Sequence, residues 1–419
     1  MAKILIKNIK SLLQVGEDFP KYVAGPAMKT VPAIEDAFLA LEDGVIVAYG
    51  PMSEWGGITD WRDLEIIDAE GCFVFPAFCD SHTHTVFAAS REEEFVDRIN
   101  GLTYEEIALK GGGILNSAGK LANMSEDQLF EEALVRIERM KSYGTGAIEI
   151  KSGYGLSVDA ELKMLRVIKR LKNEAGIVIK ATFLGAHAFP KAYKEDHEAY
   201  IKLIIEEMLP KIAEEKLADY IDVFCERNYF SVDEMTRILQ AGKQYGLIPK
   251  VHVNQFSVLG GVKAAIECGA LSVDHLEECD EADLAALKDS GCMPTLLPGC
   301  SHFLSIPFGN ARGMIDSGLP VALASDFNPG STPCDNLGMI FSLGCVKMKM
   351  TPEEALNALT INAAYAMGLS NTHGTISLGK TTPVILTKKI PSLAYIPYAF
   401  GDVHVDRLIG GIIENNLEC

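Results

Sequence analysis

Apolar and polar residues alternate at both ends of the chain in the manner of β-strands. The alternation covers five segments: residues 3–15, 36–50, 64–75, 373–388 and 401–415. Gly and Asp stand between these segments, where hairpin turns are expected. Strands from the two ends can pair with each other. We therefore predict a small β-sandwich-like domain composed of residues 1–75 and 376–419.

The middle of the chain alternates between apolar strands and amphipathic helices. Strand patterns cover residues 72–82, 145–153, 176–187, 219–226, 247–254, 271–278, 292–299 and 320–326. Helical patterns, many ending in Gly, separate them at residues 127–144, 159–176, 198–216, 232–246, 260–269 and 281–291. Near-continuous apolar strands with intervening helices are typical of a parallel sheet covered by helices. Eight such units favour an α/β fold with a TIM-type (β/α)8 barrel over residues 76–375.

Polar side chains follow nearly every predicted barrel strand. In strand order they are His82 and His84, Lys151 and Tyr154, His187, Glu226, His252, His275 and Asp326. Barrels of this kind build their active sites at the carboxyl ends of the strands. Chance would place one or two polar residues there but hardly so many. We therefore expect these side chains to meet at the mouth of the barrel.

The histidine pair in "DSHTH" is the strongest indication of a metal. Alternate residues of a strand point the same way, so His82 and His84 present their rings to one side. Two histidines at this spacing are, on their own, more often buried core residues than ligands. His252 and Asp326 at other strand ends reverse that preference. The four together predict a mononuclear site for Zn²⁺ or iron, which accept nitrogen and oxygen ligands.

A catalytic metal ion can lower the pKa of a water ligand to about 7, which favours attack on a carbonyl carbon. Asp326 would serve as ligand and as proton acceptor, and His275 would polarise the carbonyl oxygen or orient the water. The pattern therefore predicts hydrolysis of a C–N bond.

Composition restricts the possible partners. The net charge of −19 argues against nucleic acid, because phosphate binding requires clustered Lys and Arg. No window approaches the roughly 18 consecutive apolar residues of a membrane span, and the N-terminus is too interrupted by Lys for a signal peptide. The ten cysteines form no C-x-x-C pair, which indicates reduced thiols in the cytoplasm. In so acidic a protein, an anionic substrate would need a local positive pocket.

Several longer motifs carry a family resemblance. "DSHTH", "VHV", "DHLE" and "ASD" at the strand ends resemble the amidohydrolase superfamily. More narrowly, "EIKSGYGL", "TFLGAHAFP" and "SDFNPGS" resemble the imidazolonepropionases, over about residues 76–371. The resemblance implies hydrolytic opening of 4-imidazolone-5-propanoate to N-formimino-L-glutamate in histidine degradation. It also implies one Zn²⁺ or iron ion per subunit, a barrel with a small β domain, and a homodimer.

The same resemblance implies roles for individual residues. His82, His84, His252 and Asp326 match metal ligands, and His275 matches a catalytic histidine. Substrate-binding positions are matched by Arg91, Tyr104, Tyr154, His187, Asn328, Gly330 and Ser331. Independently of the family, the guanidinium of Arg91 suits a carboxylate, although an ordinary surface ion pair with a residue of Glu92–Glu94 explains it as well. The tyrosines fit packing equally, and "NPGS" predicts backbone amides free to meet an anion.

One position departs from some members of the family. Gln255 stands where they carry a Glu proposed as a base, and an amide accepts no proton at neutral pH. Gln255 is left to orient the water or the ring, and the proton transfer moves to Asp326 and His275. Lys151 is expected to support the site structurally, Glu226 has no assigned role, and "GGGIL" at residues 111–115 suggests a loop or lid near the mouth.

Two alternatives stay open. One keeps the metal and changes the substrate to another cyclic amide or an amino-heterocycle that is deaminated. The other is a barrel that has lost its chemistry. A carboxylate clamp at Arg91 disfavours the first, and the complete ligand set disfavours the second.

Overall fold

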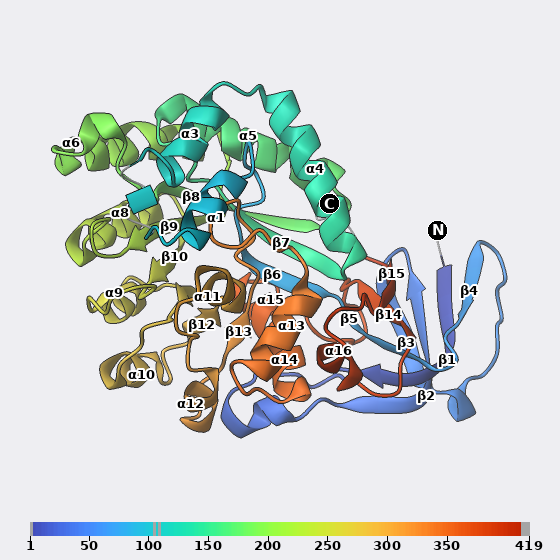
Figure 1. Cartoon of the computed structure of the whole chain (residues 1–419). Coiled ribbons are helices and arrows are strands. Elements are labelled where there is room, and N and C mark those ends of the chain that lie inside the picture. Colours follow the sequence, from blue (N-terminus) through green and yellow to red (C-terminus); the bar gives the residue numbers. More distant parts are fainter. Residues whose placement is uncertain (1–2, 104–105, 108–109, 412–419) are drawn as a thin grey trace.

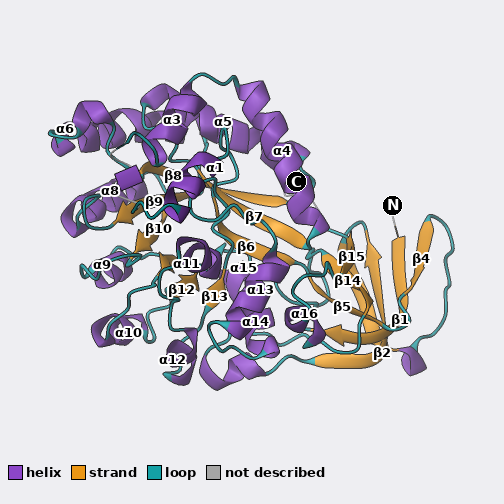
Figure 2. Cartoon of the chain, viewed as in Figure 1, coloured by secondary structure: helices purple, strands orange, loops and turns teal. Residues whose placement is uncertain are grey.

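The computed structural model describes residues 3–103, 106–107 and 110–411, which form two sheets and a set of helices (Figures 1 and 2). One sheet has eight strands and lies among the helices; the other has seven and lies beside them. No described helix has both the length and the apolar character that a membrane span requires.

The eight-stranded sheet is parallel and follows chain order from one edge to the other. Its strands are β6 (Phe78–Thr83), β7 (Thr145–Lys151), β8 (Val178–Ala186), β9 (Tyr220–Cys225), β10 (Ile248–Val253), β11 (Ser272–His275), β12 (Met293–Leu296) and β13 (Ala322–Leu323). A parallel bridge between Thr83 and Phe327 joins the two edges beyond β13. The predicted (β/α)8 barrel is thereby confirmed.

Helices cover the outside of the barrel. The described α-helices are α1 (Glu92–Ile99), α3 (Ile114–Ala122), α4 (Glu126–Ser142), α5 (Val158–Glu174), α6 (His197–Lys202), α7 (Leu209–Glu215), α8 (Val232–Gln244), α9 (Gly261–Glu267), α10 (Glu281–Leu287), α11 (Pro298–Leu304), α12 (Ala311–Asp316), α13 (Leu337–Val346), α14 (Pro352–Leu359), α15 (Ile361–Ala366) and α16 (Tyr395–Tyr398). Several helices end at the predicted glycines. Gly144, Gly176 and Gly246, for example, follow α4, α5 and α8 and have positive φ.

Two stretches differ from the sequence pattern. The helix predicted over residues 198–216 is α6 and α7 with a π-helical segment, η4 (Leu203–Met208), between them. The apolar run at residues 72–82 was expected to be one barrel strand, but it divides at Ala77 into β5 (Cys72–Pro76) of the other sheet and β6. Apolarity alone cannot show which sheet a strand joins, because both bury their strands.

The seven-stranded sheet combines both ends of the chain, as the alternating pattern predicts (Figure 1). Besides β5 it contains β1 (Lys3–Leu13), β2 (Ala33–Glu42), β3 (Val45–Pro51), β4 (Leu64–Asp68), β14 (Val384–Lys389) and β15 (Val405–Ile409). Antiparallel pairing of β14 with β5 joins the two ends. One apolar cluster takes side chains from all seven strands, including Ile6, Leu39 and Val384, so the sheet wraps around its own core.

Candidate metal centre and active site

A hollow of about 420 Å³ opens at the carboxyl ends of the barrel strands. The lining residues are His84, Arg91, Ile114, Tyr154, His187, Phe224, His252, Gln255, His275, Asp326, Asn328 and Ser331. Most of the predicted site residues therefore meet in one place, although they are distributed over 248 positions of the sequence, from 84 to 331.

The four predicted metal ligands converge at the base of this hollow. His82 Nε2 lies 3.6 Å and His84 Nε2 lies 3.7 Å from Asp326 Oδ1. His252 Nε2 lies 3.4 Å from His84 Nε2. All four side chains are buried. Overlapping groups of metal-binding atoms also include His187 and His275, so the cluster is rich in possible donors.

Two buried carboxylates fix the orientation of two of these histidines. Asp274 Oδ2 lies 2.7 Å from His82 Nδ1, and Asp222 Oδ2 lies 2.8 Å from His252 Nδ1. Carboxylates accept, so each ring carries its proton on Nδ1 and turns the lone pair of Nε2 toward the centre. Within the described residues, His82 Nε2 has no hydrogen-bond partner. Buried lone pairs that face one another without a donor are costly unless a cation lies between them, so these residues fit a metal ion.

Burial keeps the rings of His82 and His84 neutral. Burial, together with the charge of Lys151, holds the pKa of His82 well below its usual value, and burial with neighbouring His187 does the same for His84. Neutral imidazole is the form that binds a metal. Burial also raises the pKa of Asp326, which makes its carboxylate a better proton acceptor.

The Asp326 carboxylate is oriented by its own loop. Ser331 Oγ and Thr332 Oγ1 donate to Asp326 Oδ2 at 3.3 and 3.2 Å, which leaves Oδ1 toward the histidines. Asp80, in "DSHTH", accepts from the backbone N–H and the hydroxyl of Ser325 at 2.9 and 2.6 Å. Strand β6 thus holds the segment that follows β13, and the carboxylate of Asp326 is placed opposite His82 and His84.

His275 lies beside the four ligands with a carboxylate of its own. Its Nδ1 is 3.3 Å from Glu277 Oε2. Burial would lower the pKa of His275, but Glu277 raises it above its usual value. His275 has φ of +91°, a backbone conformation that non-glycine residues rarely adopt and that often marks functional sites. The ring is therefore held beside the centre and is suited to donating to an oxygen atom.

Gln255 reaches the hollow from the turn after β10. Its Nε2 lies 3.3 Å from the thiol of Cys300 at the start of α11. Glu226 at the end of β9 anchors the same turn by accepting from the backbone N–H groups of Phe256 and Ser257. This contact gives Glu226, unassigned from the sequence, a structural place in the site.

Arg91 is buried at the rim of the hollow. Its Nε lies 3.2 Å from Glu94 Oε2, so the ion pair expected as an alternative does form, but inside the protein. Glu94 also accepts at Oε1 from Gly113 N–H at 3.0 Å and from Asn116 Nδ2 at 3.1 Å. The segment at residues 111–115 is thereby joined to Arg91, and Ile114 from it lines the hollow.

Tyr154 and His187 form one wall. Glu161 accepts from the N–H groups of Gly155 and Leu156 at 2.7 and 3.0 Å, which shapes the loop that carries Tyr154. His187 Nδ1 lies 3.0 Å from the carbonyl oxygen of Gly153, so its Nε2 is the free acceptor. Burial lowers the pKa of His187 to about 3.

The "NPGS" loop differs from its expectation. The N–H groups of Gly330 and Ser331 donate to Asn328 Oδ1 at 2.8 and 2.7 Å, so the loop satisfies its own backbone amides. Asn328 Nδ2 in turn donates to the carbonyl oxygen of Asp326 at 2.7 Å. Asn328 therefore shapes the turn with its amide, and the predicted free backbone amides are not found. Tyr104, the remaining predicted substrate contact, lies outside the described residues.

Three supporting carboxylates were not identified from the sequence. Asp222 and Asp274 support histidines, and Glu161 supports the Tyr154 loop. A signal existed for the first two, since each is a lone acidic residue within an apolar strand. Charged residues are rarely buried there without a partner.

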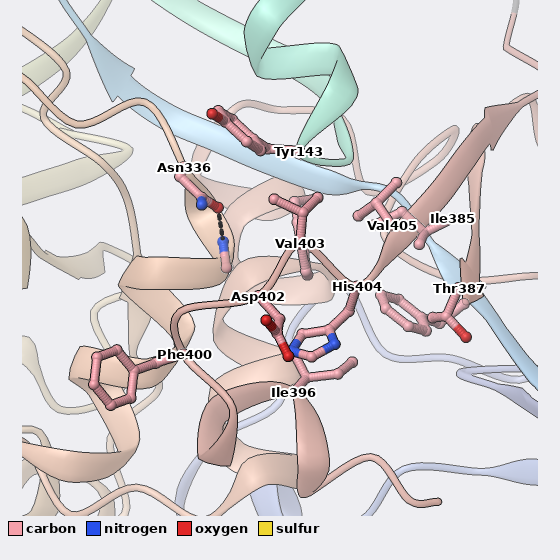
Figure 3. A pocket seen from close by; sticks show the side chains of 13 residues that line it. Tyr143, Asn336, Ile385, Thr387, Ile396, Phe400, Asp402, Val403, His404 and Val405 are labelled. Carbon is pink, nitrogen blue, oxygen red and sulfur yellow. Dashed lines mark hydrogen bonds between the residues drawn. The ribbon is translucent and has the colours of Figure 1, made fainter. Parts of the chain in front are cut away.

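A second hollow lies at the opposite end of β6, between the barrel and the seven-stranded sheet (Figure 3). Its lining includes Phe75, Phe78, Ile385 and the segment around His404. The His404 ring bonds to the carbonyl oxygen of Ala399 at 3.1 Å. No metal-binding cluster occurs there within the described part of the chain, and the lining is largely apolar.

Comparison with known proteins agrees with this geometry. A model of the amidohydrolase family matches residues 73–407. The chain is 56% identical over 410 residues to an imidazolonepropionase from Flavobacterium johnsoniae, covering 98% of this chain and 99% of that protein. It is 57% identical over 398 residues to one from Flavobacterium psychrophilum, covering 95% and 96%. A zinc-bound adenosine deaminase from Xanthomonas campestris has a similar fold, with a TM-score of 0.70 and 14% identity over 98% of this chain and 92% of that one.

Proposed function

The chain belongs to the amidohydrolase family, and we propose that it hydrolyses 4-imidazolone-5-propanoate to N-formimino-L-glutamate in histidine degradation. Full-length relatives that are named imidazolonepropionase and share more than half of their residues with this chain support the substrate. The deaminases with a similar fold are too distant in sequence to favour deamination.

The observation that carries the proposal is that one hollow contains both a cluster of metal-binding side chains and a buried cation. Asp326 and His84 belong to a cluster ready for a metal ion, and Arg91 is a buried cation at the rim. A substrate that combines a cyclic amide with a carboxylate matches both elements. A neutral nucleobase offers no carboxylate to the Arg91 guanidinium, which has donors for an anion besides the Nε that faces Glu94.

We propose that His82, His84, His252 and Asp326 hold one Zn²⁺ or iron ion per subunit. When bound, such an ion lowers the pKa of a water ligand to about 7 and polarises a carbonyl oxygen. The order of first-row metal affinities does not by itself select zinc or iron, because both accept imidazole and carboxylate ligands.

Hydrolysis consumes one water and breaks the bond between the ring carbonyl carbon and the adjacent nitrogen. The water oxygen joins that carbon and becomes part of the new carboxylate. Asp326 Oδ1 accepts the water proton and delivers it to the released nitrogen. His275 donates to the carbonyl oxygen, where negative charge develops, and Gln255 orients the water or the ring.

The remaining residues position the substrate. Arg91 binds the propionate, because a planar guanidinium matches a carboxylate. Tyr154 and Tyr104 add phenolic hydrogen bonds, and His187 Nε2 accepts from a ring N–H. Asn328, Gly330 and Ser331 shape the wall next to Arg91, so that substrate and product fit beside Asp326.

The test is metal analysis together with turnover of imidazolonepropionate. We expect about one Zn²⁺ or iron per subunit, loss of the substrate's ultraviolet absorbance, and formiminoglutamate as the product. Failure of the metal-loaded protein to turn over this substrate would exclude the specific function, and turnover of another cyclic amide or an amino-heterocycle would then replace it. We also propose that the protein is a cytoplasmic homodimer. Light scattering on the purified protein would then give twice the mass of the 45.5 kDa chain.

A further inference from the structure

Five buried charged side chains form a layer inside the barrel, directly beneath the proposed metal ligands. They are Glu149, Lys151, Asp222, Lys250 and Asp274. Each is at most 1% exposed. The proposed reaction uses neither lysine and does not use Glu149, yet burying five charges is expensive unless each is paired. Their contacts are therefore informative.

Lys151 is the centre of this layer. Its Nζ lies 2.6 Å from Glu149 Oε1, 2.8 Å from Asp222 Oδ2 and 3.5 Å from Asp274 Oδ2. An ammonium group has three donors, and here three carboxylates surround it. One cation thus joins strands β7, β9 and β11, which contribute Lys151, Asp222 and Asp274 respectively.

The carboxylate oxygens that contact Lys151 are the same atoms that hold the histidines. Asp222 Oδ2 accepts from Lys151 and from His252 Nδ1, both at 2.8 Å. Asp274 Oδ2 lies 2.7 Å from His82 Nδ1 and 3.5 Å from Lys151. Two of the four proposed metal ligands are therefore connected, each through a single oxygen atom, to one ammonium group.

We infer that Lys151 is a positioning residue of the metal centre, which holds Asp222 and Asp274 so that His252 and His82 keep their protons on Nδ1 and their Nε2 lone pairs toward the ion. Without the cation the two carboxylates repel each other, and each keeps only its other contacts, Asp222 Oδ1 with the backbone N–H of His252 and Asp274 Oδ1 with the hydroxyl of Ser272. This inference rests on the metal ligands proposed above. It predicts that Lys151 affects metal affinity, although it does not touch the metal-facing nitrogen of either ring.

Lys250 supplies a matched comparison in the same layer. It is equally buried and also pairs with Glu149, through Oε2. Its other hydrogen bonds go to the carbonyl oxygens of Ser81 and Ala366, at 2.9 and 3.2 Å. Among the described residues, Lys250 makes no contact with Asp222 or Asp274. Loss of Lys250 should therefore affect folding without changing how the histidines are held.

The experiment compares two double variants of the full-length protein, E149Q/K151M and E149Q/K250M. Each removes one positive and one negative charge from the layer, so each keeps the net charge. Dissociation constants for Zn²⁺ are measured by competition with a chelator, and the unfolding midpoint of the metal-free protein is measured in urea. E149Q alone serves as the reference for both.

We expect E149Q/K151M to bind Zn²⁺ about 10- to 100-fold more weakly than E149Q, as for loss of other groups that orient metal ligands. The Zn²⁺ dissociation constant of E149Q/K250M should stay within about threefold of that of E149Q, whatever the unfolding midpoint of the double variant in urea. Equal affinities of the two double variants would overturn the role of Lys151 and leave the proposed function intact. Absence of Zn²⁺ and iron binding by the unaltered protein would instead overturn the proposed metal centre, and this inference with it.

If E149Q/K151M does not fold, the single variant K151Q, compared with K250Q, carries the same test. A glutamine at position 151 is uncharged and has two N–H donors where lysine has three, so it cannot offset the repulsion between the two aspartates. A loss of Zn²⁺ affinity is therefore again expected for K151Q and not for K250Q. Equal affinity of these two variants would overturn the inference in the same way.

Discussion

The guanidinium of Arg91 lies against the backbone of Gly330, so closely that a Cβ atom on Gly330 would fall 1.5 Å from Arg91 Nη2. Glycine is required at this position because a side chain would collide with Arg91, and not because of an unusual backbone angle. Arg98 approaches the same residue from outside, with its Nη2 2.7 Å from the carbonyl oxygen of Gly330. The loop after β13 therefore carries Asp326 at one end and, at the other, Gly330, against which Arg91 packs.

Gly330→Ala should displace Arg91 and weaken substrate binding. Loss of one charge-assisted hydrogen bond costs about 1.5–3 kcal/mol, so we expect KM to rise about 10- to 100-fold while kcat changes less. Steady-state kinetics on imidazolonepropionate provides the measurement. Gly119→Ala, at a helical position of α3 with open space around it, is the control and should leave KM unchanged. An unchanged KM in Gly330→Ala would refute the role of this contact.

Glu94→Gln tests how Arg91 is held. The variant keeps the shape of the side chain but removes the negative charge 3.2 Å from Arg91 Nε. We expect KM to rise about tenfold, since the guanidinium loses a charged partner in a buried site. Exposed Glu93 on the same helix gives the matched variant Glu93→Gln, for which no change is expected. If both variants have the same KM, Glu94 does not position Arg91.

Asp326→Asn should reduce kcat far more than Gln255→Ala. The first variant removes a proposed ligand and proton acceptor, and loss of a general base costs about 10²- to 10⁴-fold. The second removes a neutral amide, whose hydrogen bond is worth about 0.5–1.5 kcal/mol, or roughly tenfold at most. Both are measured as kcat with metal content determined in the same samples. A larger loss in Gln255→Ala would move the proton chemistry away from Asp326.

His373 provides a test of pH-dependent stability away from the active site. Burial lowers its pKa to about 4, against about 6.5 in an unfolded chain. Because the folded value is the lower one, the neutral ring supports folding above about pH 6.5, and that support is lost as the pH falls toward 4. Between pH 7 and 5 the unfolding free energy should fall by about 2 kcal/mol on this account.

The check is chemical denaturation of the unaltered protein and of His373→Gln at pH 7 and pH 5. Glutamine does not titrate, so the variant should lose about 2 kcal/mol less over this interval than the unaltered protein. Parallel losses in the two proteins would show that His373 is not held neutral on folding.

Much of the site was predictable because it depends on strand ends. Residues at the carboxyl ends of parallel strands meet by geometry, whatever lies between them in the sequence, so His82, His84, His252 and Asp326 could be grouped from the sequence alone. Their partners could not be grouped in this way. His82 and Asp274 are 192 residues apart, and no local pattern indicates which of many acidic residues faces a given ring.

Arg91 illustrates the same limit. Its sequence neighbours predict a surface ion pair, and an ion pair with Glu94 does form, but burial of that pair depends on α3 and on the loop at Gly330. The run from Cys72 to Thr83 is another example, because its apolar residues suit either sheet equally. Pairing of β5 with β14 and of β6 with β7 decides the division.

The alternation of strands and helices, the class of fold, and the residue types available for the chemistry can be predicted from the amino-acid sequence, since they follow from local periodicity and from side-chain properties. The pairing of the buried charges, the use of the backbone amides, and the need for Lys151 and Gly330 at their positions are set by the folded barrel. Those features depend on atoms brought together across the barrel, and the free energy of a buried charge is set by what surrounds it in space.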